Sequence, residues 1–354
     1  MAADWLQSQK LTQAHGLPAF CYTDSALAAQ ERSAVFARSW QLVAHAAQLI
    51  NAGDHVVTEV AGTPLLILRD EHHELRALHN VCRHRGGPLA TSDGCGLKQL
   101  RCRYHGWTYD LSGALKSGPE LDAIADFDRA GTRLPNAQVM EWQGLVFVAL
   151  DGRVAPFEEL IAGIDARLAA RDLASFVFQR RVSYTAQCNW KAYVDNYLEG
   201  YHLPHVHPAL NRLLDYRSYR TECMRWHSLQ WSPLDGDASF YGQGEALYYF
   251  LWPNTMLNIL PGRLQTNRVV PLGVDRCRID FAYYYAPGLA QTRTEQITQD
   301  QDLAEITQQE DIDICERVQA AFASGSYNTG RVHPTREQGI HHFQELYRSA
   351  LSAL

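Results

Sequence analysis

The sequence predicts an α+β protein, and three observations lead to this prediction. From Trp40 to about residue 150, short β-rich runs alternate with glycine and turn residues, which indicates a small antiparallel β domain. Beyond about residue 155, strand patterns mix with helical ones, and a long helical pattern runs from about 293 to 324. We therefore expect a helical N-terminal segment at 1–40, a β domain at 41–153 and an α+β domain at 154–354.

Local patterns predict the elements of the C-terminal part. We expect a helix near 156–172 and a second helix from Asn189 to Tyr201, where helix formers occur without a proline. Pro204 lacks an N–H group and restricts Leu203 before it, so this helix should end near His202. Strand patterns occupy residues 178–188, 246–262, 264–273 and 277–287.

Composition narrows the class of protein. The chain has 354 residues, of which 46% are hydrophobic and 20% charged, as in ordinary soluble globular proteins. No run of apolar residues is long enough to cross a membrane and the N-terminus has no signal-peptide core, so we expect a cytoplasmic protein without a membrane partner. The net charge of −7 argues against nucleic acid as a partner. Eight irregularly spaced cysteines favour metal ligation over a disulfide framework.

Two pairs of cysteine and histidine lie between residues 80 and 110. Cys82 and His84 form one pair and Cys102 and His105 the other, each in a glycine-flanked loop. A tetrahedral zinc site could use these four ligands. A Rieske [2Fe–2S] centre uses the same ligands differently, with both cysteines on one iron and both histidines on the other. Cys95 fits neither pair, and we expect it to be a small packed thiol.

A second group of metal-ligand types lies in "DNYLEGYHLPHVHPAL". Asp195, Glu199 and His202 have the spacing of one helix face, and His205 and His207 follow. In a continuous helix, residues five apart point about 140° away from each other, so His202 and His207 converge only if the helix breaks after His202. A pair of His202 and His205 is the rival arrangement, and hydrogen-bonded structural histidines are the other interpretation.

The loops "CRHRGGPL" and "CRYHGWTYD" closely resemble the two cluster-binding loops of Rieske proteins. They lack the additional cysteine that links the loops in respiratory-chain Rieske proteins. A Rieske motif followed about a hundred residues later by Glu199-x2-His202-x4-His207 resembles the α subunit of Rieske non-haem iron oxygenases, and the resemblance covers nearly the whole chain. It implies a [2Fe–2S] cluster on Cys82, His84, Cys102 and His105, and a catalytic antiparallel sheet wrapped around a long helix.

The resemblance also implies a mononuclear Fe(II) site held by His202, His207 and a carboxylate from the late helix. Asp311 matches the family position, and Glu310 and Asp313 are nearby competitors. Two imidazoles and one carboxylate bind iron on one face and leave open positions for O2 and substrate. The long part of the chain beyond the cluster motif, which contains these residues, argues against a pure electron carrier.

In the family, electrons cross between subunits of a homotrimer through a carboxylate that bridges a Rieske histidine and an iron-bound histidine. Glu199 occupies that position, where most members have aspartate, and the resemblance gives it His105 and His202 as partners. Asp195, one turn earlier, is expected to add hydrogen bonds around the site. Because no GxGxxG motif follows a predicted strand, NAD(P)H should be oxidised on a separate flavin and iron–sulfur reductase. Basic residues around the cluster loops offer a docking surface for it: Arg83, Arg85, Lys98, Arg101 and Arg103.

The substrate prediction depends on the resemblance. Family members with glutamate at the bridge include enzymes that oxidise carnitine and related trimethylammonium compounds, and the segment 254–285 is similar to choline- and betaine-oxidising members. This implies a monooxygenase acting on an N-methyl or trimethylammonium compound, by oxidative demethylation or C–N cleavage. Strand aromatics could hold such a cation or could be plain core: Tyr249 with Leu251, or Phe250 with Trp252. The alternative is a hydroxylase or dioxygenase of an aromatic acid, with Arg263 or Arg268 pairing the substrate carboxylate.

Overall fold

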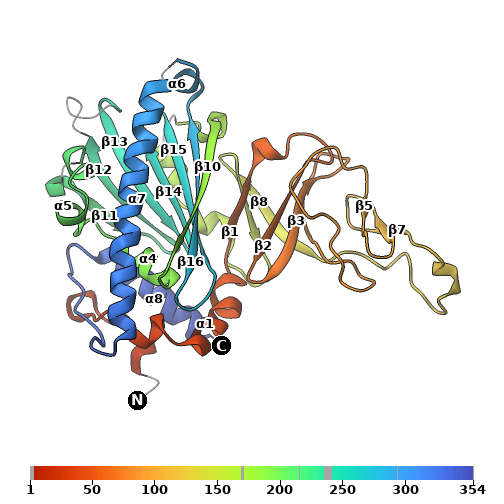
Figure 1. Cartoon of the computed structure of the whole chain (residues 1–354), viewed down its shortest axis with the longest axis horizontal. Helices are drawn as coiled ribbons and strands as arrows, with labels where there is room; N and C mark the ends of the chain where they lie inside the picture. The colour runs from red at the N-terminus through yellow and green to blue at the C-terminus, as the bar shows by residue number, and fades with distance from the viewer. Residues whose placement is uncertain (1–3, 169–170, 215, 235–240, 293, 354) are drawn as a thin grey trace. The chain divides into compact units, whose positions relative to one another are not determined.

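The chain has an α+β fold with antiparallel sheets, which confirms the predicted fold class (Figure 1). The computed structural model describes residues 4–168, 171–214, 216–234, 241–292 and 294–353. It divides into two compact units. One unit spans Phe36–Val154, and the other combines the residues up to Val35 with those from Ala155 onward.

The unit Phe36–Val154 contains two antiparallel sheets. The larger has the strand order β1-β9-β8-β4-β3-β2 and the smaller the order β5-β6-β7. Their bounds are β1 Gln41–His45, β2 His55–Val60, β3 Thr63–Arg69, β4 Leu75–His79, β5 Leu100–Arg101, β6 Thr108–Tyr109, β7 Leu115–Ser117, β8 Asn136–Trp142 and β9 Leu145–Ala149.

Strand β3 is buried on both faces and connects two cores. Leu66 and Leu68 pack in one core with Cys82 and Cys102, while Leu65 belongs to the core on the opposite face. Side chains alternate between the faces of a strand, so neighbouring leucines serve different cores. The two cysteine-bearing loops are thereby anchored to the larger sheet.

The other unit is built on a seven-stranded antiparallel sheet with the order β10-β16-β15-β14-β13-β12-β11. The long helix α7, Thr294–Ala323, lies across this sheet (Figure 1). The strands are β10 Val177–Ala186, β11 Arg220–Cys223, β12 His227–Leu234, β13 Gly244–Leu251, β14 Thr255–Leu260, β15 Arg263–Pro271 and β16 Cys277–Tyr285. The other helices are α1 Ser25–Glu31, α2 Phe157–Leu160, α3 Ile164–Leu168, α4 Trp190–Tyr197, α5 Leu203–Val206, α6 Pro287–Thr292 and α8 Gln338–Ser352.

The helix before the histidine cluster ends earlier than expected. Helix α4 stops at Tyr197, and Glu199 lies in the turn after it. At Gly200 an added Cβ would lie 2.8 Å from the ring of Tyr219, so the chain passes too close to that ring for a side chain. Pro204 is in the first turn of α5, where a missing N–H costs nothing. The proline therefore starts a second helix instead of ending the first.

Other predictions need smaller corrections. The helix expected at 156–172 is two short helices, α2 and α3, and residues 169 and 170 of that prediction lie outside the described residues, as does residue 293 at the start of the expected long helix. Strand β12 was not predicted, because its buried side chains include His227, Ser228 and Gln230, which hide the apolar pattern of a strand. None of the helices in the described part of the chain combines the length and the apolar character needed to cross a membrane.

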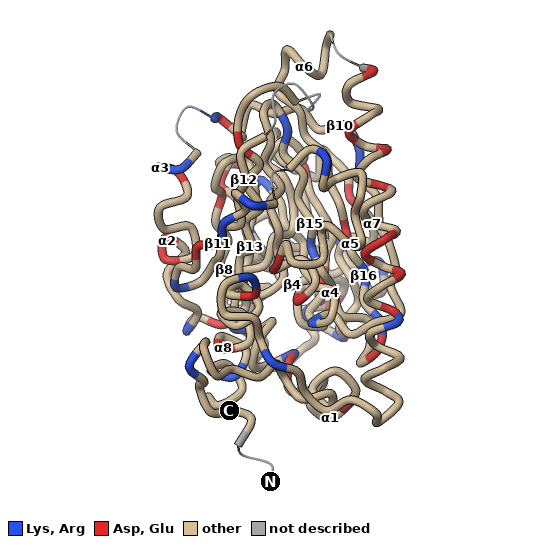
Figure 2. The backbone as a smooth tube through the Cα atoms, turned by 90° about the vertical axis from the view of Figure 1, so that its left-hand side faces the viewer, with Lys and Arg blue, Asp and Glu red and all other residues tan. Residues whose placement is uncertain are grey.

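Helix α7 is strongly acidic. It carries eight carboxylates and a single basic residue, Arg317. Figure 2 shows the acidic residues distributed along the helix. Most face solvent, but Asp300 is buried and Asp311 is mostly covered, which places two of these carboxylates on the side of the helix that meets the sheet.

Candidate functional site

The two cysteine-bearing loops have the same backbone geometry. In the first, Gly86 N–H donates to the carbonyl of Cys82 at 3.0 Å, and in the second Gly106 N–H donates to the carbonyl of Cys102 at 3.0 Å. Both glycines have positive φ, 72° and 75°, a conformation that favours glycine. The shared spacing C-x-x-x-G therefore folds both cysteines into equivalent tight loops.

The four predicted cluster ligands differ in exposure according to residue type. The thiols of Cys82 and Cys102 are buried, whereas His84 is exposed and His105 is half-buried. The two imidazole rings lie side by side, with ring centroids 4.6 Å apart. Trp107 stacks on His84 at 4.9 Å, which holds that ring in place. This arrangement fits a cluster with its cysteine-bound iron inside and its histidine-bound iron at the surface.

The spacing of the donor atoms also fits a two-iron cluster. An added Cβ at Gly87 would lie 2.8 Å from Cys102 Sγ, so the glycine leaves room for the sulfur. Ligands of a single zinc ion would lie within roughly 4 Å of one another. Among the described residues, no three of these four bring their donor atoms within 4.8 Å of each other. Tyr109 Oη lies 3.2 Å from Cys82 Sγ, within hydrogen-bond distance, and would donate to this sulfur in its thiolate form.

In the unit built on the seven-stranded sheet, His202, His207 and Asp311 converge. Their possible ligand atoms all lie within 4.8 Å of one another, the one such group among the described residues. Asp311 Oδ1 is 2.9 Å from His207 Nε2 and 3.8 Å from His202 Nε2. Two imidazoles and a carboxylate arranged in this way fit the three-ligand face of a mononuclear iron site.

Short helix α5 positions the two histidines. His202 is its N-cap and His207 its C-cap, so four helical residues separate them and their rings approach to 5.0 Å. Asp311 comes from α7, and Asn196 on α4 donates a hydrogen bond of 2.5 Å to Asp311 Oδ1. The break expected after His202 is therefore absent, because residues 203–206 are helical. The chain leaves the helix only at His207, whose backbone has φ −118° and ψ 69°.

Each histidine has a carboxylate on its outer nitrogen. Glu199 Oε1 lies 2.6 Å from His202 Nδ1, and Glu310 Oε2 lies 2.7 Å from His207 Nδ1. A carboxylate accepts only, so both Nδ1 atoms carry protons and both Nε2 atoms face the space where a metal would bind. Burial opposes protonation of His207, but the hydrogen bonds and charges of Asp311 and Glu310 outweigh it and raise its pKa.

The remaining predicted residues lie elsewhere. His205 is exposed and outside the three-residue group. Asp313 is exposed and accepts a hydrogen bond from Gln309 at 2.8 Å. Asp195 accepts from Tyr22 at 2.5 Å and from Gln344 at 3.1 Å, contacts that join α4 to the N-terminal segment and to α8. Cys95 is exposed, so the expectation of a packed thiol is wrong, because the segment between the two cluster loops lies at the surface.

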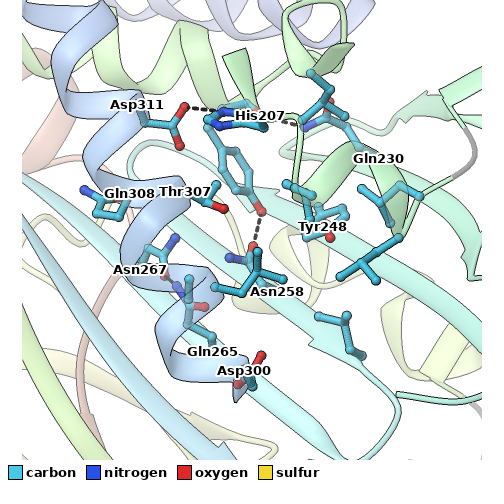
Figure 3. A pocket seen from close by; sticks show the side chains of 18 of the residues that line it. His207, Gln230, Tyr248, Asn258, Gln265, Asn267, Asp300, Thr307, Gln308 and Asp311 are labelled. Carbon is cyan, nitrogen blue, oxygen red and sulfur yellow. Dashed lines mark hydrogen bonds and ion pairs between the residues drawn. The ribbon is translucent and has the colours of Figure 1, made fainter. Parts of the chain in front are cut away.

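A cavity adjoins the three converging residues. His202, His207 and Asp311 line it, together with residues of α7 and of the central strands β12 to β15 (Figure 3). Of the aromatic strand residues considered from the sequence, Tyr249, Phe250 and Trp252 are buried outside the lining, and Phe250 and Trp252 pack on Phe343 of α8. Tyr248 is the residue of that strand run that reaches the cavity.

The sheet presents a polar row to the cavity. Gln230, Tyr248, Asn258 and Gln265 are register partners across four neighbouring strands, and all four line the cavity. Asn267 lies two residues beyond Gln265 on the same face. The sequence analysis missed this row, because the residues belong to separate strands and only the pairing register aligns them.

A buried ion pair also lines the cavity. Arg263 Nε is 2.8 Å from Asp300 Oδ2, and both side chains are almost completely buried. The hydroxyls of Tyr241 and Tyr285 also donate to Asp300. Burial lowers the pKa of Arg263, but the neighbouring Asp300 more than compensates and holds it above its ordinary value. Arg263, considered from the sequence as a partner for a substrate carboxylate, is thus paired with Asp300 within the protein.

Comparisons with known proteins agree with both sites. Residues 39–128 match the model of the Rieske [2Fe-2S] domain, and residues 173–353 match that of the ring hydroxylating alpha subunit catalytic domain. The chloroplastic choline monooxygenase of Arabidopsis thaliana is 31% identical over 94% of this chain and 82% of its own length. The carnitine monooxygenase oxygenase subunit of Escherichia coli K12 is 29% identical over 94% of this chain and 93% of its own.

A solved structure is similar over the whole chain. A quaternary ammonium Rieske monooxygenase, crystallised with an inhibitor, superposes with a TM-score of 0.88 at 26% identity, covering 99% of this chain and 98% of its own. Both cofactor sites, the family matches and these relatives lead to the same conclusion. The chain belongs to the Rieske oxygenases, as an alpha subunit with a [2Fe–2S] domain and a mononuclear-iron catalytic domain.

Proposed function

We propose that this protein is a terminal oxygenase that oxidises a small quaternary ammonium compound at a carbon bound to nitrogen, by oxidative demethylation or C–N cleavage. The observation that carries the proposal is the cavity beside His202, His207 and Asp311, whose lining combines tyrosines and amides with a group of leucines. The relatives support the same substrate class, since they are named as choline and carnitine monooxygenases.

The cavity suits a cation. Five tyrosines contribute to its lining, and aromatic faces attract quaternary ammonium groups: Tyr193, Tyr197, Tyr219, Tyr241 and Tyr248. Helix α7 forms one wall and places the carboxylates of Asp300 and Asp311 in the lining, while most of its other carboxylates face solvent. A permanently charged trimethylammonium group would be attracted by both.

The aromatic-acid alternative fits less well. Gln230, Asn258, Gln265 and Asn267 present buried amides to the cavity. Gln230 and Gln265 already pair both ends of their amides within the protein. An aromatic ring placed against Asn258 and Asn267 would offer their amide nitrogens no hydrogen bond, which costs about 1–3 kcal/mol for each unpaired group. This side of the cavity therefore favours a polar group of the substrate, while the seven leucines of the lining offer an apolar wall for the rest of it.

We assign the cofactors to the residues that the geometry fits. Cys82, His84, Cys102 and His105 hold the [2Fe–2S] cluster, and His202, His207 and Asp311 hold the mononuclear iron. When bound, the cluster supplies electrons singly and the iron activates O2 beside the substrate.

The protein's own groups prepare the iron site. Glu199 and Glu310 hold the Nδ1 protons of the two histidines, which keeps both Nε2 atoms available as ligands. Asn196 donates to Asp311 and restricts the rotation of its carboxylate. Because ligand atoms are held in place before the metal binds, little conformational entropy is lost on binding.

Glu199 is also our candidate for the electron path between subunits. Its side chain is only 10% exposed and accepts from His202 Nδ1 and from the backbone N–H of His202. In this proposal the carboxylate also receives a hydrogen bond from His105 of a neighbouring copy in a homotrimer. The related quaternary ammonium monooxygenase is described as transferring electrons between subunits.

As the oxygenase subunit of a Rieske system, the protein depends on a separate reductase. We propose that this partner is an NAD(P)H-dependent flavin and iron–sulfur protein, which docks on the basic residues around the cluster loops, and that both work in the cytoplasm. In the same proposal, residues 1–40 pack on the catalytic domain 154–354, and residues 41–153 form the Rieske domain.

Product analysis with a panel of substrates tests the proposed function. The holoenzyme would be supplied with electrons and O2 and offered choline, carnitine, trimethylglycine, benzoate and salicylate, with products identified by mass spectrometry. We expect oxidation of at least one ammonium compound. The variant His207→Ala should keep the cluster spectrum and form no product. Oxidation of the aromatic acids alone would refute the substrate class.

A mixed-subunit experiment tests the electron path. One variant, Cys82→Ser, would lack the cluster, and the other, His207→Ala, would lack the iron. If electrons cross between subunits, mixed oligomers regain activity although each parent is inactive. Failure of properly assembled mixtures to regain activity would contradict the role given to Glu199.

A further inference from the structure

Two amide side chains in the cavity wall have their carbonyl oxygens occupied by other residues of the protein. Asn267 lies on β15 and Gln308 on α7, and both are only 2% exposed although they line the cavity. Figure 3 shows Asn267, Thr307 and Gln308 close together, between Asp311 and Gln265. This group is distinct from the three metal-site residues.

The orientation of Asn267 is set by a chain of hydrogen bonds that starts at a charged group. Arg263, paired with Asp300, donates to Gln265 Oε1, and a guanidinium can only donate. Gln265 must therefore turn its amide nitrogen away from Arg263, and Gln265 Nε2 donates to Asn267 Oδ1 at 2.8 Å. The carbonyl of Asn267 is thereby occupied, and its Nδ2 group is left for the cavity.

Gln308 supplies a second donor. Its Oε1 accepts a hydrogen bond of 2.5 Å from the hydroxyl of Tyr193, which belongs to α4. Its Nε2 is buried and has no hydrogen-bond partner among the described residues. Buried N–H groups are almost always paired, so an unpaired one that lines a cavity indicates that a ligand supplies the acceptor.

The position of Gln308 relates this donor to the iron site. Gln308 precedes Asp311 by three residues on α7, which is about 4.5 Å along the helix axis. A small molecule held at Gln308 would therefore extend to the neighbourhood of His202, His207 and Asp311. A substrate in which a few bonds separate the anchoring oxygen from an N-methyl group matches this spacing.

We propose that Asn267 and Gln308 bind a carboxylate of the substrate, so that the preferred substrate carries a carboxylate and a quaternary ammonium group in one small molecule. This inference rests on the proposed function. The two amides offer donors alone, and a carboxylate offers acceptors alone, whereas an alcohol brings a proton of its own that needs another acceptor. The nearby carboxylate of Asp300 is neutralised by Arg263 and does not repel such a ligand.

Binding measurements with two matched ligands test the proposal. Trimethylglycine and choline share the trimethylammonium group and differ in carboxylate against hydroxyl. Isothermal titration calorimetry on the iron-loaded enzyme with an oxidised cluster, without O2, gives Kd without turnover. We expect trimethylglycine to bind the wild type more tightly than choline. In Asn267→Asp, the added negative charge should weaken trimethylglycine at least about tenfold and leave choline within about threefold.

Two further variants separate binding from folding. Gln308→Met keeps the size of the side chain and removes the amide, and should also weaken trimethylglycine selectively. Gln309→Glu adds a charge at the next residue, which is exposed, and should change neither Kd. The cluster absorption and the melting temperature identify variants that fail to fold, and the Kd ratio of the two ligands is unaffected by partial loss of active protein.

The possible results distinguish the two proposals. Equal weakening of both ligands by Asn267→Asp and by Gln308→Met would give these amides a structural role and overturn the inference, while the proposed function would stand. Equal affinity of the wild type for both ligands would overturn it as well. If the wild type binds neither ligand but binds benzoate, the proposed function fails and the carboxylate site is then tested with benzoate on the same variants.

Discussion

Replacement of Glu310 by glutamine should weaken metal binding at the iron site although Glu310 is not itself a ligand in our assignment. Its carboxylate accepts a hydrogen bond from His207 Nδ1 at 2.7 Å, and the His207 side chain is only 1% exposed, so water cannot replace the lost acceptor. A charged hydrogen bond of this kind contributes roughly 1.5–3 kcal/mol. We therefore expect metal affinity to fall by about 10- to 100-fold in Glu310→Gln.

Cobalt titration measures this effect. Co(II) would be added to protein depleted of the mononuclear iron, with its cluster intact, and binding followed by competition with a chelator. Asp313→Asn is the matched control, because it removes one negative charge from the same helix at an exposed position that accepts from Gln309. We expect this control to bind cobalt within about twofold of the wild type.

The two variants together distinguish the effect of orienting the His207 ring from the effect of the negative charge on α7. Equal losses in Glu310→Gln and Asp313→Asn would refute the hydrogen-bond argument, because only the general negative potential of α7 would then matter. An unchanged affinity in Glu310→Gln would show that His207 needs no acceptor on Nδ1. Asp311→Asn should lose far more metal affinity than either variant, because it changes a ligand. A smaller loss in Asp311→Asn than in Glu310→Gln would mean that Glu310 is the ligand and Asp311 is not.

Three further predictions concern stability and redox potential. Burial raises the pKa of Asp195 from 3.8 to about 7, so between these pH values the folded state keeps a proton that the unfolded state loses. The free energy of unfolding should therefore fall by up to about 4 kcal/mol as the pH rises from about 4 to 7. Asp195→Asn should flatten this pH dependence in thermal melts. Tyr109→Phe removes the hydrogen bond to Cys82 Sγ and should lower the cluster potential by roughly 40 mV in a redox titration, whereas an unchanged potential would mean that the sulfur does not accept this bond. Glu31→Ala leaves the buried Lys191 ammonium unpaired and should cost about 3–5 kcal/mol in denaturant unfolding; a loss below about 1 kcal/mol would contradict the ion pair.

The cluster loops and several strands could be predicted because their signals are local. Gly86 and Gly106 stand at the same spacing after Cys82 and Cys102, and each spacing specifies one tight loop. The strands β15 and β16 and helix α7 were expected nearly where they occur. These elements depend on neighbouring residues in the chain, which the sequence displays directly.

The parts that could not be predicted depend on contacts between distant residues. Helix α4 ends before Glu199, in a turn where Tyr219 approaches Gly200, and nothing in the local sequence indicates that approach. The partner of Asp195 on α8, Gln344, is 149 residues away. The polar wall of the cavity combines residues from four strands and one helix, so it exists only once the strand register is known.

A single-turnover reaction tests the central claim most directly. Holoenzyme would be reduced without O2, freed of excess reductant, mixed with trimethylglycine, choline or carnitine, and exposed to O2, with cluster oxidation followed by electron paramagnetic resonance and products by mass spectrometry. Our account predicts that a demethylated or cleaved ammonium product forms in proportion to the clusters oxidised, and that Glu199→Ala retains both cofactors but slows cluster oxidation. Cluster oxidation without any ammonium product, together with oxidation of an aromatic acid under the same conditions, would contradict it.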